Sequence, residues 1–275
     1  MKNAEKTSKK RPRIFEDHAL TNLEKQHRFL DRHASIDEKL DQAFAEIDWK
    51  RRNEAEKSIV KWVWTYCIGL LLDDAPPPKG KDVLNQMHAA MAAHSNYLIC
   101  MPRGSGKSSY IECVTLHALA TGLQKFVVII SNNTRAATGI LNDVGRAISE
   151  PDTPFAQDYP AVCFPFQVCK GSFRRRQLYK GQSTEIQKTA GNITLARLRD
   201  ENGDELPSSG SVVTVRGISG GIRGMKHGKM RPTCVLLDDL QTTEIAENPE
   251  QVEKLMALIR KDVMNLGGKE RLSIL

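Results

Sequence analysis

Apolar residues fall into compact blocks along this chain, and polar or glycine-rich segments separate them. Three blocks are short and continuous, which is typical of strands buried on both faces. We therefore expect strands at Tyr97–Met101, Phe126–Ser131 and Cys234–Leu237. The final residues, RLSIL, have the same character and predict a further core strand.

Apolar residues at helical spacing predict two helical stretches near the N-terminus. A capping box at Ser35–Glu38 opens an amphipathic helix that runs toward Glu56. Trp62–Leu72 continues as a more buried helix, and three prolines then break the pattern. The run that opens at Lys79–Gly80 predicts another helix, whose apolar face consists of Val83, Leu84, Met87 and Met91.

Two further helices are expected on either side of the Phe126–Ser131 strand. The first runs from Ser108 to about Thr121, where Gly122 ends it. The second begins after Ser131, and its apolar face consists of Ile140, Leu141, Val144 and Ile148. Alternation of strands and helices favours the α/β class with a mostly parallel sheet.

The remaining segments predict connections and one antiparallel pair. Pro151–Pro165 holds four prolines and is expected to form a loop. Ile193–Leu198 and Ser211–Val215 alternate between apolar and polar residues around an Asn202–Gly203 turn, which predicts a hairpin inserted in the α/β core. Gly217–Lys229 contains five glycines and several bases, so we expect a mobile basic loop there.

Composition adds a possible polyanionic partner, because the 275-residue chain carries a net charge of +7. Lys and Arg gather in residues 1–13, 165–200 and 216–231. Each run alone is most often a solvated face, and the first is about as well explained as a solubilising tail. Three such runs in one chain favour nucleic acid more strongly.

Cysteine spacing and hydropathy exclude several classes. The six cysteines form no C-x-x-C pair, which argues against a zinc or redox motif. Cys100 and Cys234 lie within expected strands, so we predict that both pack in the core. The charged N-terminus has no apolar core behind it, and no apolar run is long enough to span a bilayer. A reduced, cytosolic protein is expected.

The segment Pro102–Ser109 carries the clearest candidate chemistry, because it joins an expected strand to an expected helix. Such a loop lets backbone amides and the helix N-terminus surround phosphate oxygens. Lys107 would then reach the outer phosphates, and Ser108 would ligate Mg²⁺. Met101 replaces the first glycine of the G-x-x-x-x-G-K-[ST] pattern, and an ordinary Gly/Ser turn is the alternative. The candidate ATP-binding residues are Arg103, Gly104, Ser105, Gly106, Lys107, Ser108 and Ser109.

Three other positions are candidates for the same site. Asp238 ends an apolar strand, where a nucleotide-binding protein places a carboxylate for Mg²⁺. Asp239 follows it and would orient the attacking water, although acids after an apolar strand are common. Gln86 lies upstream of the loop and would read the adenine edge, whereas most such glutamines lie on the surface.

With these motifs in hand, residues 80–275 resemble the ATPase part of the large terminase subunit, the DNA-packaging motor of tailed bacteriophages. The resemblance rests on PRGSGKSS at 102–109, GGIRGMKHGKMRP at 220–232 and VLLDD at 235–239. It implies a P-loop NTPase of the RecA-like type, with a mostly parallel central sheet flanked by helices. An N-terminal helical extension would precede that fold.

The resemblance also implies the roles of the site residues. Lys107 and the loop amides would hold the phosphates of ATP, while Ser108 and Asp238 would hold Mg²⁺. Asp239 would orient the attacking water, and Arg103 would support the charge that develops on the γ-phosphate, as an arginine finger does. The family usually has Glu after the metal-binding Asp, so Glu244 is an alternative water-activating carboxylate.

The resemblance further implies partners and a location. The motor would move double-stranded DNA into a procapsid, together with a portal protein and a small terminase subunit. It would act as a homo-oligomeric ring in the cytoplasm of the bacterial host and transiently on the procapsid, without a membrane. Candidates for DNA contacts or for a finger acting on a neighbouring subunit are Arg216, Arg223, Lys226, Lys229 and Arg231.

Two regions are expected: a basic tail and helical region at 1–75, and the ATPase domain at 76–275. The family's coupling motif and nuclease domain do not follow RLSIL, so we expect a C-terminally truncated or split terminase without nuclease activity. The alternatives are another P-loop translocase or helicase, and a non-catalytic assembly protein that binds ATP and nucleic acid. A small-molecule kinase fits the basic loops less well.

Overall fold

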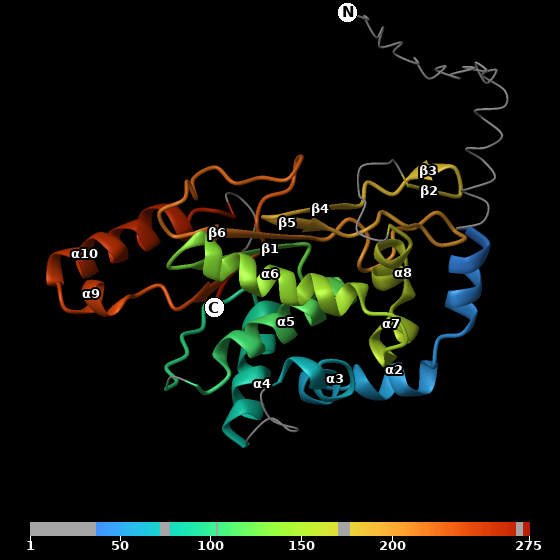
Figure 1. Ribbon diagram of the computed structural model, residues 1–275, viewed down its shortest axis with the longest axis horizontal. Coiled ribbons are helices and arrows are strands. Elements are labelled where there is room, and N and C mark those ends of the chain that lie inside the picture. The colour runs from blue at the N-terminus through green and yellow to red at the C-terminus, as the bar shows by residue number, and fades with distance from the viewer. Residues whose placement is uncertain (1–36, 72–77, 103, 170–176, 268–271) are drawn as a thin grey trace, which may run out of the picture.

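The computed structural model describes residues 37–71, 78–102, 104–169, 177–267 and 272–275 (Figure 1). They form an α/β fold with a mixed, mostly parallel six-stranded sheet in the order β4-β5-β6-β1-β7-β8. The strands of this sheet are β1 (Phe126–Ser131), β4 (Gln187–Thr189), β5 (Asn192–Thr194), β6 (Val212–Gly217), β7 (Cys234–Asp238) and β8 (Ser273–Ile274). A separate two-stranded sheet consists of β2 (Leu178–Tyr179) and β3 (Gln182–Ser183).

Helices α5 and α6 lie directly against the sheet (Figure 1). Besides a helix at residues 37–45, the helices are α2 (Trp49–Ala55), α3 (Ile59–Tyr66), η1 (Ile68–Leu70), α4 (Pro78–Ala92), α5 (Lys107–Thr121), α6 (Thr134–Ser149), α7 (Pro154–Asp158), α8 (Pro160–Cys169), α9 (Thr243–Ala246), α10 (Pro249–Leu258) and η2 (Ile259–Val263). In the part of the chain that the structure describes, no helix combines the length and apolar character needed to cross a membrane.

The central strand is β1, all of whose residues are buried. It pairs in parallel with β6 on one side and with β7 on the other, which places Ser131 beside both Gly217 and Asp238. The carboxyl ends of three strands therefore meet at one edge of the sheet. The predicted strands at Phe126–Ser131 and Cys234–Leu237 are confirmed, because a continuous apolar run suits a strand covered on both faces.

The two faces of β1 pack against different parts of the chain. Val127 and Ile129 belong to the core that includes α3 to α6, so helices cover this face. Phe126, Val128 and Ile130 face a second core, which is built from the segment after β6 and from residues around η2. The second face is therefore covered mainly by irregular chain rather than by long helices.

Helix α5 is confirmed at the place where the sequence predicts it. Every residue from Tyr110 to Ala120 is buried, because α5 lies between the sheet and the N-terminal helices. Gly122 ends it with a φ of 72°, and a Cβ atom there would lie 2.2 Å from the carbonyl oxygen of Pro207. Both the backbone conformation and the space require glycine at this position.

The expected strand at Tyr97–Met101 is wrong as a regular element. Asn96 forms only a parallel bridge with Ile274, and the segment lies beside β8 at the sheet edge. The segment is not buried along its length as a central strand would be, since Leu98 is 85% exposed and Cys100 is exposed as well. An apolar run does not distinguish a central position from an edge one, so the core prediction fails for Cys100 and holds for the buried Cys234.

Two further predictions need correction near the N-terminus. The helix expected between Ser35 and Glu56 is interrupted at residues 46–48, where the Asp48 side chain accepts a hydrogen bond from the Arg51 backbone and starts α2. The helix expected over Trp62–Leu72 ends at Tyr66 and continues as the short turn η1. Ser35 and the predicted boundary near residue 75 lie outside the described residues.

Most of the proline-rich segment 151–165 is helical rather than a loop, because α7 covers Pro154–Asp158 and α8 begins at Pro160. Pro154 and Pro160 stand at the first positions of α7 and α8, where a missing backbone N–H leaves no hydrogen bond unmade. Thr153 adds the side-chain cap of α7 by accepting from the Ala156 backbone. Pro165 lies inside α8. Three of the four prolines therefore start or continue helices. The prediction of a loop is wrong because prolines at these positions do not break a helix.

The predicted hairpin is present as the antiparallel pair β5 and β6, with Asn192 beside Thr214. Its turn at Asn202–Gly203 is also confirmed. The first strand ends at Thr194 instead of Leu198, although the residues up to Leu198 stay mostly buried. The pair is no insertion, because β6 continues the main sheet next to β1.

The N-terminal helices are fastened to α7 by a buried carboxylate. The Asp158 side chain accepts from the guanidinium of Arg51 at 2.6 and 2.7 Å, from the hydroxyl of Tyr66 at 2.7 Å and from the backbone of Asp48 at 3.2 Å. A buried charge needs such a full set of donors. Residues 48–66 are therefore held against the same core as the sheet.

Candidate functional site

An open hollow of about 390 Å³ lies at the carboxyl edge of the sheet, where the segment after residue 102 meets the ends of β1 and β7. Parallel strands commonly bind ligands outside this edge. The residues that line it are Gly104, Ser105, Gly106, Lys107, Ser108, Ser109, Ser131, Asn132, Ala136, Asp238 and Asp239. Most of the sequence-predicted site residues are thus brought together.

Two glycines shape the loop that enters α5. Gly104 and Gly106 have φ values of 75° and 77°, in the left-handed region that side chains avoid. Gly106 is also the N-cap of α5, and it provides no side-chain hydrogen bond to the first turn. The leading N–H groups of α5 therefore have no side-chain cap, which leaves the helix N-terminus suited to an anion.

Lys107 closes this loop on itself. Its ammonium donates to the carbonyl oxygen of Met101 at 2.9 Å and to that of Pro102 at 3.1 Å. The Ser105 hydroxyl donates to the same Pro102 oxygen at 2.7 Å. The Lys107 ammonium is therefore held beside the hollow by neutral carbonyl oxygens, and a bound phosphate would compete with them for it.

Ser108 and Asp238 join the loop to the end of β7. The Ser108 hydroxyl donates to a carboxylate oxygen of Asp238 at 3.0 Å. Burial raises the pKa of the Asp238 carboxyl and the negative charge of Asp239 adds to this, whereas the Ser108 hydrogen bond and the charge of Lys107 act in the opposite direction. The Ser108 hydroxyl and the Asp238 carboxylate thus provide two adjacent oxygen atoms, which are hard ligands.

This pair fits Mg²⁺, which is commonly held by one or two carboxylates together with substrate phosphates and water. Among the described residues, no three or more His, Cys, Asp or Glu side chains converge on a metal position by themselves. A cation at Ser108 and Asp238 would thus need further oxygen ligands from a bound phosphate.

Asp239 lines the hollow in a strained backbone conformation. Its φ is 44°, in the left-handed region, and its side chain is exposed. Asp tolerates this region better than most residues, yet the conformation still has an energetic cost. Strain of this kind is concentrated at functional sites.

We expect Asp239→Gly to be more stable than Asp239→Ala by about 1 kcal/mol, because only glycine adopts this φ without strain. Urea unfolding of the two variants measures the difference. The same pair of substitutions at Glu253, which is exposed within α10, should give the opposite sign because glycine weakens a helix. An Ala variant at 239 as stable as the Gly variant would contradict the strain.

The structure adds Glu112, which sequence reasoning missed. It lies one turn after Ser108 on α5 and is buried among apolar residues. Burial raises the pKa of its carboxyl to about 7; the charges of Asp143 and Asp238 act in the same direction, and that of Arg146 opposes them. The signal was available, since an acid inside the apolar run IECVTLHALA is unusual.

Glu112 should make the protein less stable as the pH rises. Its pKa is about 7 in the folded state against 4.5 for an ordinary glutamate, so the folded state holds the proton more tightly. Stability should fall between about pH 4.5 and pH 7 by roughly 3 kcal/mol from this group, and then level off. In Glu112→Gln, denaturant titrations across this range should lack that fall; an unchanged pH profile would contradict the assignment.

Two predicted site residues stand apart from the hollow, and a third is not among the described residues. Gln86 is exposed on α4 and is not among the residues that line it. Glu244 is exposed on α9 and does not line it either. Arg103 lies outside the described residues. Of the two candidate water-activating carboxylates, Asp239 lines the hollow and Glu244 does not.

The basic segment after β6 contains no regular element beyond a bridge between His227 and Met230. It is nevertheless anchored, because Ile218, Ile222 and Met225 are buried in the second core. The prediction of an irregular segment is confirmed, and its mobility stays a prediction. The polar side chains project outward, while the apolar ones cover β1.

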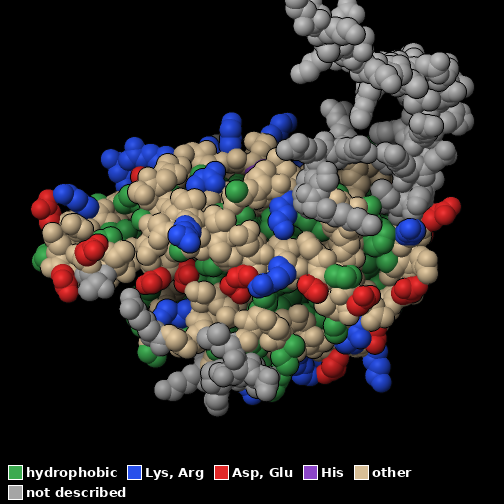
Figure 2. Space-filling view, viewed as in Figure 1, with side chains coloured by type: hydrophobic (Ala, Val, Ile, Leu, Met, Phe, Trp, Pro, Cys, Tyr) green, Lys and Arg blue, Asp and Glu red, His purple; other side chains and the backbone are tan. Residues whose placement is uncertain are grey.

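The five candidate bases, of which Arg216 lies in β6 and the other four in this segment, differ in their contacts. Arg223 forms an ion pair with Asp262 of η2 at 2.6 Å. The guanidinium of Arg231 donates to Met225 O at 3.3 Å, and that of the half-buried Arg216 donates to its neighbour's carbonyl at 2.8 Å. Lys226 and Lys229 are exposed. Figure 2 shows Lys and Arg side chains gathered along the edge where this segment runs.

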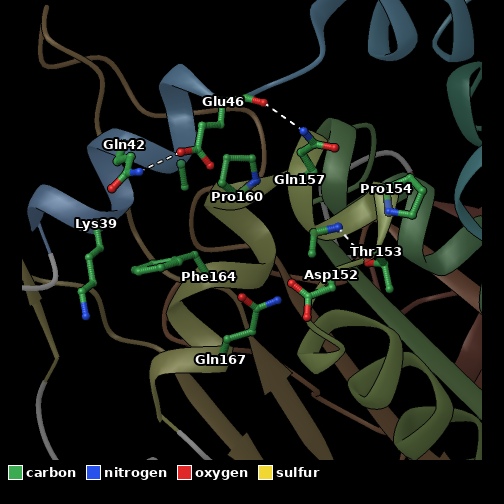
Figure 3. A pocket seen from close by; sticks show the side chains of 12 residues that line it. Lys39, Gln42, Glu46, Asp152, Thr153, Pro154, Gln157, Pro160, Phe164 and Gln167 are labelled. Atoms are coloured by element: carbon green, nitrogen blue, oxygen red, sulfur yellow. Dashed lines mark hydrogen bonds between the residues drawn. The ribbon is translucent and has the colours of Figure 1, made fainter.

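A larger hollow, of about 760 Å³, lies between the helix at 37–45 and the helices α7 and α8 (Figure 3). Its amides are already engaged: Gln42 donates to the Glu46 side chain, and Gln157 donates to the Glu46 backbone. Gln167 likewise donates to the Glu150 carbonyl. The three amide side chains of this hollow are therefore already occupied by contacts within the described residues.

Comparison of the sequence with models of known protein families gave no match, and a search of curated proteins gave none either.

Proposed function

We propose that this chain is a P-loop ATPase that belongs to a viral DNA-packaging motor of the terminase type. The observation that carries the proposal is the hydrogen bond from Ser108 to Asp238, which joins the Gly-rich loop to the end of β7. In a P-loop enzyme these two side chains share Mg²⁺. The α/β fold with its mostly parallel sheet is compatible with the RecA-like type.

The proposed reaction is in-line hydrolysis of ATP. Lys107 leaves the carbonyl oxygens of Met101 and Pro102 and binds the outer phosphates, while the first amides of α5 hold the phosphate oxygens. Asp239 orients the attacking water, and Arg103 supports the charge on the γ-phosphate. Mg²⁺ at Ser108 and Asp238 would neutralise charge on the transferred phosphoryl group.

DNA translocation is supported by the anchored basic segment. It begins at Gly217, which lies beside Ser131 in the register of the sheet, and it leads into the strand that ends at Asp238. A change at the phosphate site therefore reaches the segment through few residues. Contacts to the DNA backbone suit a motor because they do not depend on sequence.

The wider assembly follows from the family resemblance. The partners would be double-stranded DNA, a portal protein, a small terminase subunit and further copies of this chain in a ring, in the cytoplasm of a bacterial host. The alternative, a non-catalytic ATP-binding assembly protein, is kept because Asp239 stands where the family has Glu. Binding without turnover would favour it.

Lys107→Ala should abolish binding of a fluorescent ATP analogue, because the ammonium supplies the positive charge on the outer phosphates. Asp238→Ala should retain some binding and lose Mg²⁺-dependent phosphate release. Lys254→Ala is the control, since it removes the same charge from the exposed face of α10. Wild-type affinity in Lys107→Ala would overturn the ATPase proposal.

Lys226→Ala should weaken DNA binding and lower the slope of log affinity against log salt by about one, because one phosphate contact releases about one counterion. ATP hydrolysis without DNA should stay unchanged. Lys57→Ala, which removes an exposed lysine beyond α2, should leave the slope intact. An unchanged slope in Lys226→Ala would show that this lysine is only a solvated surface residue.

A further inference from the structure

Two asparagines follow β1 at the edge of the hollow, and hydrogen bonds connect them in series. The Asn133 side-chain oxygen accepts from the Ala136 backbone at 2.9 Å, which caps α6. The Asn133 side-chain nitrogen donates to the Asn132 side-chain oxygen at 2.6 Å. A relay thus runs from the first turn of α6 to Asn132.

These two hydrogen bonds determine the orientation of the Asn132 and Asn133 side-chain amides. The oxygen of Asn133 must face the N–H of Ala136, so its NH₂ group must face Asn132. The oxygen of Asn132 is consequently occupied, and its NH₂ group makes no hydrogen bond within the described residues. Asn132 therefore presents hydrogen-bond donors, and it lines the hollow.

The position of Asn132 follows from the register of the sheet. Ser131 pairs with Asp238, so the next residues, Asn132 and Asp239, leave adjacent strands at the same level. Adjacent strands lie about 4.8 Å apart. The hollow therefore has an amide donor on the β1 side, a carboxylate on the β7 side, and Lys107 on the loop that faces both.

We propose that Asn132 donates a hydrogen bond to a terminal phosphate oxygen of a bound nucleoside triphosphate, and that Asn133 positions it for this. The inference rests on the proposed ATPase function. A neutral donor suits an oxygen on which negative charge develops, whereas Asp239 suits the water that attacks from the other side. A nucleoside diphosphate lacks the terminal phosphate and makes no contact with Asn132.

The direct test is Asn132→Ala in the full chain, with Asn132→Asp as the isosteric variant that replaces the donors by a charge. Both should slow phosphate release about 10²-fold, as loss of one transition-state donor does. Affinity for a non-hydrolysable ATP analogue should fall, while affinity for ADP should remain unchanged in Asn132→Ala. Wild-type turnover, or an equal loss of ADP and analogue affinity, would overturn the inference.

The positioning role has its own test in Asn133→Ser. Serine keeps the helix cap but is too short and lacks the NH₂ group to orient Asn132. The matched control is Asn248→Ser, the same substitution at the N-cap of α10. We expect a melting temperature close to that of the wild type for both variants. Only Asn133→Ser should show slower turnover and weaker binding of the non-hydrolysable analogue, with unchanged ADP affinity. Equal turnover in both variants would refute the relay.

The failure of this inference can be told apart from failure of the ATPase proposal by measuring Lys107→Ala in the same assays. If Lys107→Ala binds nucleotide like the wild type, the ATPase proposal fails and the inference fails with it. If Lys107→Ala loses binding while Asn132→Ala matches the wild type in turnover and in analogue affinity, only the inference fails.

Discussion

The architecture depends on one strand that is buried on both faces and paired in parallel on both sides. Because β1 sits between β6 and β7, its register fixes the level at which three strands end. The chemistry-bearing side chains stand at that level or one residue beyond it, as Asp238, Asp239 and Asn132 do. Helix α5 then supplies Lys107 and Ser108 from the helical face.

The two faces of the sheet are covered by different kinds of structure. On one face the helices form a continuous core that reaches the N-terminal helices through Asp158 and its donors. On the other face Ile218, Ile222 and Met225 replace a helix with an anchored basic segment. Apolar anchors at short intervals let the same few residues cover β1 and present positive charge outward.

Local patterns predicted the elements that are buried on all sides. Phe126–Ser131 and Lys107–Thr121 were found because burial on all sides leaves a continuous apolar signature. Tyr97–Met101 failed because the same signature occurs at a sheet edge, and 151–165 failed because prolines at helix starts resemble breakers.

The site was predictable as far as its motif extends. Lys107, Ser108, Asp238 and Asp239 line one hollow, as the sequence indicated. Asn132 was out of reach because its role depends on strand register, which no short stretch of sequence displays. The hydrogen bonds that Lys107 makes within the loop also affect how a ligand would bind and leave. Lys107 already has two carbonyl partners, so a phosphate would exchange bonds instead of adding them, and each lost bond would weaken the proposed complex by about 1 kcal/mol. A site that re-forms its own contacts as the product departs favours rapid release over tight retention, which is what repeated turnover requires.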